Sequence, residues 1–312
     1  MTDTPAGNST DRFLARTATG QPLLGDREGF VPLAAADPTL ETVGKALRFA
    51  SGGLPDPNEA TARPIPPEDL SLTVPFDPGR LLGIGLNYAD HAADLDESSP
   101  EEPVTFLKPR TSLTGPGGPI RLPPPDVSDR VTAEAELAVV IGRTCRDVAP
   151  ENAGEVVAGY LAVIDLTAED VLQRNPRFLT RAKGYDTFLV VGATVAVLDG
   201  DGRDDGRDGD GSDSNGSEDG TGNGLAGLED LAVRTVVNDD LVAENTISNM
   251  HASPADLVSV CSRSATLRPG DVISTGTPGA GVVEPGDTVR AEVDRVGTVT
   301  APVVRDGADG SA

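Results

Sequence analysis

The sequence lacks several residue types on which common protein classes depend. It has no tryptophan, aromatic residues make up 3% of its 312 residues, and its only cysteines are Cys145 and Cys261. Two cysteines are too few for a disulfide framework in a chain of this length. No apolar run approaches the length of a membrane-spanning helix, and the first residues lack the basic and apolar regions of a signal peptide. We therefore expect a cytoplasmic protein with no membrane partner.

Positive charge is also scarce. Lys plus Arg is 25 against 50 Asp plus Glu, which gives a net charge of −25, and the only lysines are Lys45, Lys108 and Lys183. A surface this negative repels nucleic acid and anionic lipid, so we expect no nucleic-acid partner. Excess acid with few lysines and aromatics favours a halophilic protein, because dissolved ions screen the self-repulsion. An ordinary acidic protein from a GC-rich genome is the alternative.

Several catalytic signatures are absent. There is no Gly-x-Ser-x-Gly, and two histidines with two cysteines give no zinc-site spacing. Gly83 and Gly85 follow an apolar run, as in a dinucleotide-binding loop, but Tyr88 stands where the third glycine belongs. These observations argue against serine hydrolases of that type, zinc proteins and dinucleotide-binding enzymes.

Short apolar runs bounded by Gly and Pro dominate the chain from residue 80 onward, which is typical of strands. We expect strands at 81–88, 104–108, 135–142, 159–166, 188–197, 271–276, 287–293 and 296–304. Helix signals are few and predict helices at 39–50, 89–95, 150–157 and 254–262. The pattern indicates a mixed, β-rich α+β fold with short helices at strand ends.

Composition divides the chain in two. Residues 1–75 read as a small N-terminal module that ends in a Pro-rich linker, and residues 76–312 as a larger, β-rich domain. Within the latter, 199–222 contains nine acids and eight glycines, so we expect a disordered insertion there. A calcium loop does not fit, because Gly211 and Gly222 occupy the positions of its first Asp and closing Glu.

Three carboxylates fall among residues that pattern as core. Strand alternation places Glu134 and Glu136 on one face together with Ala138, while Asp165 aligns with Val163. Burying three uncompensated carboxylates is costly, and a hard cation such as Mg²⁺ removes that cost. The alternative is that both glutamates lie at an exposed strand end and that Asp165 begins a turn.

Six segments in order resemble the fumarylacetoacetate hydrolase family: GIGLNYADHAAD, EPVTFLKP, AEAELAVVIG, GYLAVIDLTAED, RAKGYDTF and GDVISTGTP. The resemblance covers roughly residues 80–304, apart from the acidic insertion. It implies a fold, a mixed β-sandwich roll with a smaller N-terminal region, and a homodimer as the usual assembly.

The resemblance also implies a site. Glu134, Glu136 and Asp165 would hold Mg²⁺, with Mn²⁺ or Ca²⁺ as alternatives, and the substrate would be a 2-oxo acid or its enol. Lys183 would stabilise enolate charge, and Thr277 with Gly276 would contact the substrate carboxylate. A solvated lysine and a plain turn before a strand are the competing interpretations of these positions.

Two positions match a catalytic pair of relatives with hydrolase or decarboxylase activity, which carry a His and, three residues later, a Glu. Here the pair is His91 and Asp94, which would orient a water or carry protons, and a surface histidine is the alternative. The chain departs from the family at Glu169, where an Arg is common, and at Leu172, where many relatives have Gln. Glu169 would weaken binding of a substrate carboxylate.

The leading expectation is therefore a metal-dependent enzyme for hydrolytic C–C cleavage of an acylpyruvate or fumarylacetoacetate-type substrate. One alternative keeps the metal and changes the outcome, to isomerisation of a 2-hydroxydienoate, decarboxylation of oxaloacetate, or dehydration of a 2-oxo-3-deoxy sugar acid. The other is a catalytically diverged protein that only binds an oxo acid.

Overall fold

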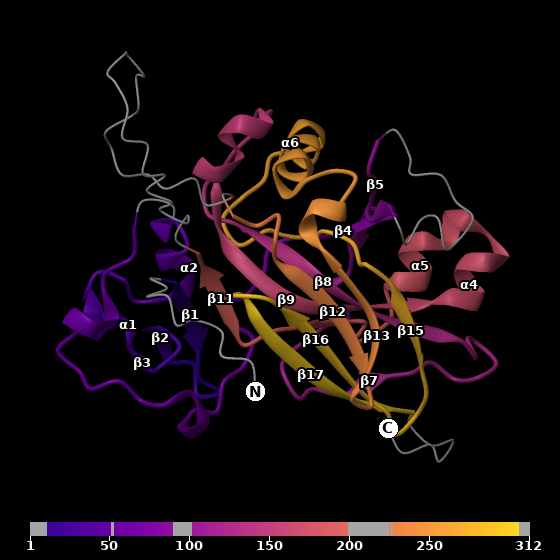
Figure 1. Cartoon of the computed structure of the whole chain (residues 1–312), viewed down its shortest axis with the longest axis horizontal. Coiled ribbons are helices and arrows are strands. Elements are labelled where there is room, and N and C mark those ends of the chain that lie inside the picture. Colours follow the sequence, from indigo (N-terminus) through magenta and orange to yellow (C-terminus); the bar gives the residue numbers. More distant parts are fainter. Residues whose placement is uncertain (1–10, 51–52, 90–101, 199–224, 226, 306–312) are drawn as a thin grey trace.

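Two β-sheets packed face to face form the body of the molecule (Figure 1). The computed structural model describes residues 11–50, 53–89, 102–198, 225 and 227–305. Within these residues the larger sheet has twelve strands, nine of them in the order β3-β2-β1-β11-β9-β8-β14-β4-β5; β10 pairs with β9 and β6, and β15 with β8. The smaller sheet has the order β13-β12-β16-β17-β7.

The strands of the larger sheet are β1 (Arg12–Arg16), β2 (Pro22–Gly25), β3 (Phe30–Pro32), β4 (Leu81–Gly85), β5 (Val104–Lys108), β6 (Leu113–Thr114), β8 (Val131–Ile141), β9 (Val157–Ala168), β10 (Leu189–Val191), β11 (Thr194–Val197), β14 (Val272–Ser274) and β15 (Ala280–Val283). Those of the smaller sheet are β7 (Ile120–Arg121), β12 (Ala232–Val237), β13 (Asp240–Thr246), β16 (Thr288–Val293) and β17 (Gly297–Val304).

The helices are short and lie around the sheets. The α-helices are α1 (Leu33–Ala36), α2 (Val43–Ala46), α4 (Glu169–Arg174), α5 (Leu179–Lys183) and α6 (Pro254–Ser264). The 3-10 helices are η2 (Pro57–Glu59), η3 (Pro67–Asp69), η4 (Arg110–Ser112), η5 (Pro150–Glu155), η6 (Pro176–Phe178) and η7 (Ile247–Asn249).

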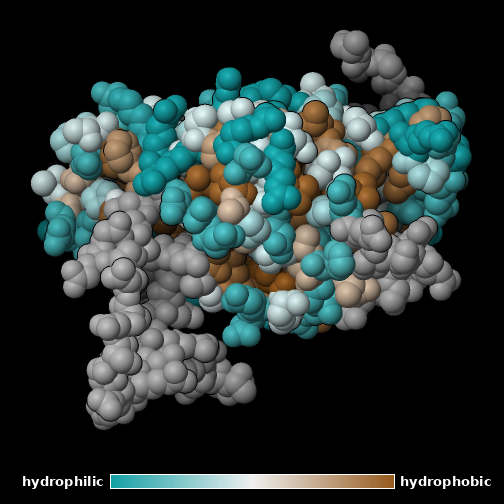
Figure 2. Space-filling view, turned by 90° about the horizontal axis from the view of Figure 1, so that it is seen from above, coloured by the Kyte–Doolittle hydropathy of each residue, from teal (hydrophilic) through white to brown (hydrophobic). Residues whose placement is uncertain are grey.

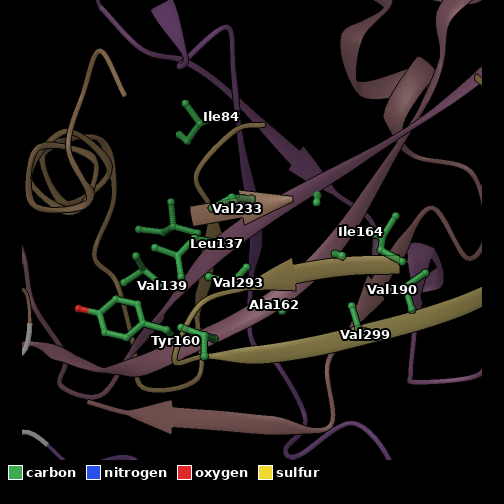
Figure 3. Packing of buried hydrophobic residues seen from close by; sticks show 14 of the residues in the cluster. Ile84, Leu137, Val139, Tyr160, Ala162, Ile164, Val190, Val233, Val293 and Val299 are labelled. Atoms are coloured by element: carbon green, nitrogen blue, oxygen red, sulfur yellow. The ribbon is translucent and has the colours of Figure 1, made fainter. Parts of the chain in front are cut away.

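The long antiparallel pair β8–β9 is the centre of the fold, and its two faces have different surroundings. One face carries Leu137 and Ile164, which pack against Val293 and Val299 of the smaller sheet in the main core (Figure 3). The other face carries residues such as Ala138 and packs with the N-terminal strands in a second cluster. Both faces of β8 read as apolar because both are packed, and the carboxylates lie on the second face.

The mixed, β-rich fold expected from the sequence is confirmed. The predicted strand 188–197 is divided into β10 and β11. The strand predicted over 104–108 is present as β5 with those bounds, and the other six predicted strands are present with changed ends. Strands β1–β3 continue the larger sheet because β1 pairs with β11. The division into residues 1–75 and 76–312 stays a prediction.

The predicted helices agree with the structure only in part. The helix expected over 39–50 is only α2, because Thr42 caps its start by accepting from the backbone N–H of Lys45, while Thr39 donates to Asp37 instead. The segment 150–157 is the 3-10 helix η5 rather than an α-helix. Helix α6 is confirmed, with a capping box between Ser253 and Asp256. The helix expected over 89–95, from residue 90 on, and the insertion 199–222 lie outside the described residues.

Among the described residues, no helix has the length and apolar character needed to cross a bilayer. Figure 2 shows one face of the molecule on which hydrophilic residues predominate, with hydrophobic residues visible between them.

Candidate metal centre

Three carboxylates meet on one face of β8 and β9. Glu134 lies directly opposite Asp165 in the antiparallel register, and Glu136 follows two residues along β8 on the same face. One ligand oxygen from each residue lies within 4.8 Å of the other two. Asp165 is 0% exposed and Glu136 is 1% exposed, while Glu134 is partly buried. All three residues lie inside β8 and β9, so they are neither at an exposed strand end nor at the start of a turn.

Two buried lysines partly balance this charge. The ammonium of Lys183, at the end of α5, lies 2.8 Å from Oε2 of Glu134 and 3.3 Å from Oδ2 of Asp165. The ammonium of Lys108, in β5, lies 2.5 Å from Oδ1 of Asp165 and donates to the carbonyl oxygens of Lys183 and Phe188. Lys108 therefore joins the aspartate to the end of the helix that carries the other lysine.

The electrostatics of the two lysines differ. Desolvation lowers the pKa of Lys108, despite the nearby Asp165. Desolvation acts on Lys183 in the same direction, but Asp165, Glu134 and Glu136 together outweigh it and raise its pKa. Lys183 is thus held firmly as an ammonium among the three carboxylates.

Glu136 accepts its hydrogen bonds from uncharged groups. Its Oε2 accepts hydrogen bonds from the hydroxyl of Ser274 and from the backbone N–H of Gly276 at 2.9 Å. Burial, followed by the charge of Asp165, raises the pKa of Glu136 to about 8. Near neutral pH without a cation, this carboxyl is therefore mostly protonated.

The remaining sequence-predicted residues lie as follows. Gly276 contacts Glu136, whereas the hydroxyl of Thr277 donates to the carbonyl of Gly279 within the same turn. His91 and Asp94 lie outside the described residues. The roles proposed for these four residues stay predictions.

The two departures from the family pattern lie at α4. Glu169 is the first residue of the helix, and its side chain accepts a long hydrogen bond from Gln173. Leu172 packs against the main hydrophobic core.

Sequence reasoning missed three polar neighbours of the carboxylates. These are Lys108, Ser274, and Thr167, whose hydroxyl donates to Oε1 of Glu134 at 2.9 Å. A signal for Lys108 was present, since a lysine in an apolar strand stands out in a chain with three lysines. No local signal marks Ser274, because it reaches Glu136 across 138 residues of sequence.

The donor set fits a divalent cation. All three candidate ligands are carboxylates, which suit hard cations such as Mg²⁺, Mn²⁺ or Ca²⁺. Neither oxygen of Asp165 has a hydrogen-bond partner among the described residues beyond its ion pairs with the two lysines. Buried carboxylate oxygens of this kind are suited to direct coordination.

The comparisons with known proteins place the chain in a family. The family model for the fumarylacetoacetate (FAA) hydrolase C-terminal domain matches residues 80–304. The chain is 31% identical over 299 residues to the Xenopus laevis protein named oxaloacetate tautomerase fahd2, mitochondrial, covering 90% of this chain and 84% of that one. It is 33% identical over 270 residues to the Escherichia coli 4-hydroxyphenylacetate degradation bifunctional isomerase/decarboxylase, covering 84% of this chain and 56% of that one.

A solved structure shares both sequence and fold. The crystal structure of 5-carboxymethyl-2-hydroxymuconate delta-isomerase from Mycobacterium smegmatis is 32% identical, with a TM-score of 0.68 over 95% of this chain and 99% of that one. The family match covers well over half of the chain and includes every residue of the carboxylate cluster. The protein is therefore a member of the fumarylacetoacetate hydrolase family of enzymes.

Proposed function

We propose that the chain is a divalent-metal-dependent enzyme that isomerises or tautomerises a 2-oxo acid through its enol, or decarboxylates it. The observation that carries the proposal is the buried cluster of Glu134, Glu136 and Asp165 with Lys183 and Lys108 against it. We take Mg²⁺ as the first candidate ion, with Mn²⁺ and Ca²⁺ as alternatives.

The charge of the cluster favours an anionic substrate. Once Glu136 has lost its proton, as metal binding requires, the three carboxylates and two ammonium groups carry one net negative charge. A bound divalent cation would make the site net positive and would polarise a keto oxygen as a Lewis acid. The ammonium of Lys183 supplies a fixed hydrogen-bond donor for an oxygen on which enolate charge develops. Lys108, saturated by Asp165 and two carbonyl oxygens, holds the aspartate in place.

The relatives favour isomerisation over the hydrolysis that the sequence put first. Their names give a tautomerase, an isomerase/decarboxylase and a delta-isomerase. Interconversion of keto and enol forms moves a proton between carbon and oxygen, and hydrolysis additionally requires an activated water. The pair expected to orient that water, His91 and Asp94, lies outside the described residues. C–C hydrolysis therefore becomes the alternative, and the homodimer, the cytoplasmic location and the salt adaptation stay predictions.

The test is a substrate panel in concentrated KCl with Mg²⁺, with Mn²⁺, or with chelator. The panel contains the enol form of oxaloacetate, a 2-hydroxydienoate diacid and an acylpyruvate. The reactions are monitored by the decrease in ultraviolet absorbance of the enol and by the release of pyruvate or CO₂. We expect metal-dependent loss of the enol that Asp165→Asn abolishes. Glu41→Gln is the matched control, because Glu41 is a surface acid paired with Lys45.

Each outcome has a clear meaning. Pyruvate and a second acid from the acylpyruvate would restore hydrolysis as the main activity. Pyruvate and CO₂ from oxaloacetate would assign decarboxylation. The proposal fails if the folded, metal-loaded protein converts none of the compounds, or if turnover survives chelation.

A further inference from the structure

A buried hydroxyl without a partner lies beside the carboxylate cluster. Thr132 is 5% exposed, and its Oγ1 has no hydrogen-bond partner among the described residues. Buried hydroxyl groups are nearly always hydrogen-bonded, so an unpartnered one indicates a missing partner. The structural alternative is a threonine whose hydroxyl is paired with water.

The strand register places this hydroxyl on the face of the carboxylates. Thr132 precedes Glu134 by two residues on β8, and alternation therefore gives their side chains the same direction. Across β9, Thr132 lies opposite Thr167, whose own hydroxyl reaches Oε1 of Glu134. On the other side, Thr132 lies opposite Val282 of β15, a residue that is 46% exposed. The row Val282–Thr132–Thr167 thus leads from the surface to the edge of the cluster.

The polar groups along β8 have a definite order. Going backward along β8 from Glu136, the Gly276 N–H lies at Glu136 and Lys183 lies at Glu134 and Asp165. Thr132 follows in this direction, at the other end of the row. Two residues of a strand span about 6.6 Å, which a chain of two or three carbons and a hydrogen bond can bridge. A 2-oxo acid held at the cluster would therefore extend its far end either toward Gly276 or toward Thr132.

We propose that Thr132 is a specificity-determining residue that binds a second, neutral oxygen of the substrate, a hydroxyl or carbonyl beyond the carbon next to the keto group. This inference rests on the proposed function, because it requires a 2-oxo acid at the carboxylates. A neutral oxygen fits better than a second carboxylate. Thr132 offers only a hydroxyl, and the two cations of the cluster are already paired with Glu134 and Asp165.

The test compares two ligands that differ in that oxygen only. Binding of 4-hydroxy-2-oxopentanoate and of 2-oxopentanoate to the Mg²⁺-loaded protein is measured by calorimetry. A neutral hydrogen bond of this kind contributes about twofold to tenfold in affinity. We expect the wild type to prefer the 4-hydroxy acid by about that factor. Thr132→Val should remove the preference and leave the Kd of 2-oxopentanoate within about twofold, as the loss of one hydrogen bond requires.

Thr132→Ser is the matched control, because it keeps the hydroxyl and should keep the preference. Thr132→Val is nearly isosteric, and its melting temperature and Mg²⁺ affinity report on any loss of structure. A preference that persists in the valine variant, or is absent from the wild type, overturns the role of Thr132 and leaves the proposed function standing. If neither acid binds the Mg²⁺-loaded wild type, the proposed function itself fails.

Discussion

Metal binding by this protein should depend steeply on pH because of one carboxyl group. Burial and the neighbouring charge of Asp165 raise the pKa of Glu136 to about 8. A carboxyl group must lose its proton before it coordinates a cation. Protons and metal therefore compete for Glu136 across the neutral range, in which an ordinary glutamate is fully ionised.

The size of the effect follows from this pKa. Below about pH 8, the ionised fraction of Glu136 falls tenfold with each unit of pH. The apparent affinity for Mg²⁺ or Mn²⁺ should therefore fall about tenfold per pH unit, and reach a plateau above the pKa. Between the plateau above the pKa and roughly pH 6 the loss approaches 100-fold, or about 2.7 kcal/mol.

Stability without metal should respond in the opposite direction. The folded-state pKa of Glu136 lies above its model value of 4.5. The unfolded chain therefore loses this proton first, and the contribution of Glu136 to stability decreases as the pH rises between these two values. Glu136→Gln keeps a neutral side chain that can accept from Ser274 and Gly276, so it should remove this pH dependence as well as metal binding.

The assay is a calorimetric titration with Mn²⁺ at fixed high salt, from about pH 6 to pH 9, with thermal melts of the metal-free protein alongside. Proton release measured in buffers of different ionisation enthalpy should approach one proton per metal at the acid end. A metal affinity that stays constant between about pH 6 and pH 8 would refute the reasoning about Glu136.

Two further predictions concern the groups that position the carboxylates. Lys108→Met leaves Asp165 without one buried counter-charge and should cost about 3–5 kcal/mol of folding free energy. Mg²⁺ should raise the melting temperature of this variant more than that of the wild type. An equal rise would contradict the prediction. Gly276 has a φ of +94°, and Gly276→Ala introduces a Cβ that would lie 2.9 Å from Cβ of Asn87. Because the Gly276 N–H donates to Glu136, we expect lower thermal stability and weaker Mn²⁺ binding. Unchanged values of both would contradict this prediction.

The sequence contained the central part of the site because strand alternation is a local property. Residues two apart share a face, so Glu134 and Glu136 could be placed together with their apolar neighbours from spacing alone. Asp165 could be aligned within its own strand in the same way, but its position opposite Glu134 depends on the register between β8 and β9. That register became an expectation only through the family resemblance.

The parts that were missed depend on contacts between distant segments. Ser274 and Lys108 reach the site from strands paired on either side of β4, and no local pattern reports that pairing. The helix predicted over 39–50 was too long because Thr42 caps the observed helix, which begins only at Val43. Asp37, Thr39 and Thr42 all have side chains that can cap a helix, and their spacing alone does not select one of them.

The distribution of lysine links the composition of the chain to its site. Arginine supplies 22 of the 25 basic residues, and two of the three lysines lie at the carboxylate cluster. An ammonium is compact and has three donors, and Lys108 directs them to one carboxylate and two carbonyl oxygens in a fully buried position. The planar fork of a guanidinium is larger and cannot direct its donors in this way. The third lysine, Lys45, pairs with Glu41 at the surface, so the buried space around Asp165 and Glu134 holds both of the others.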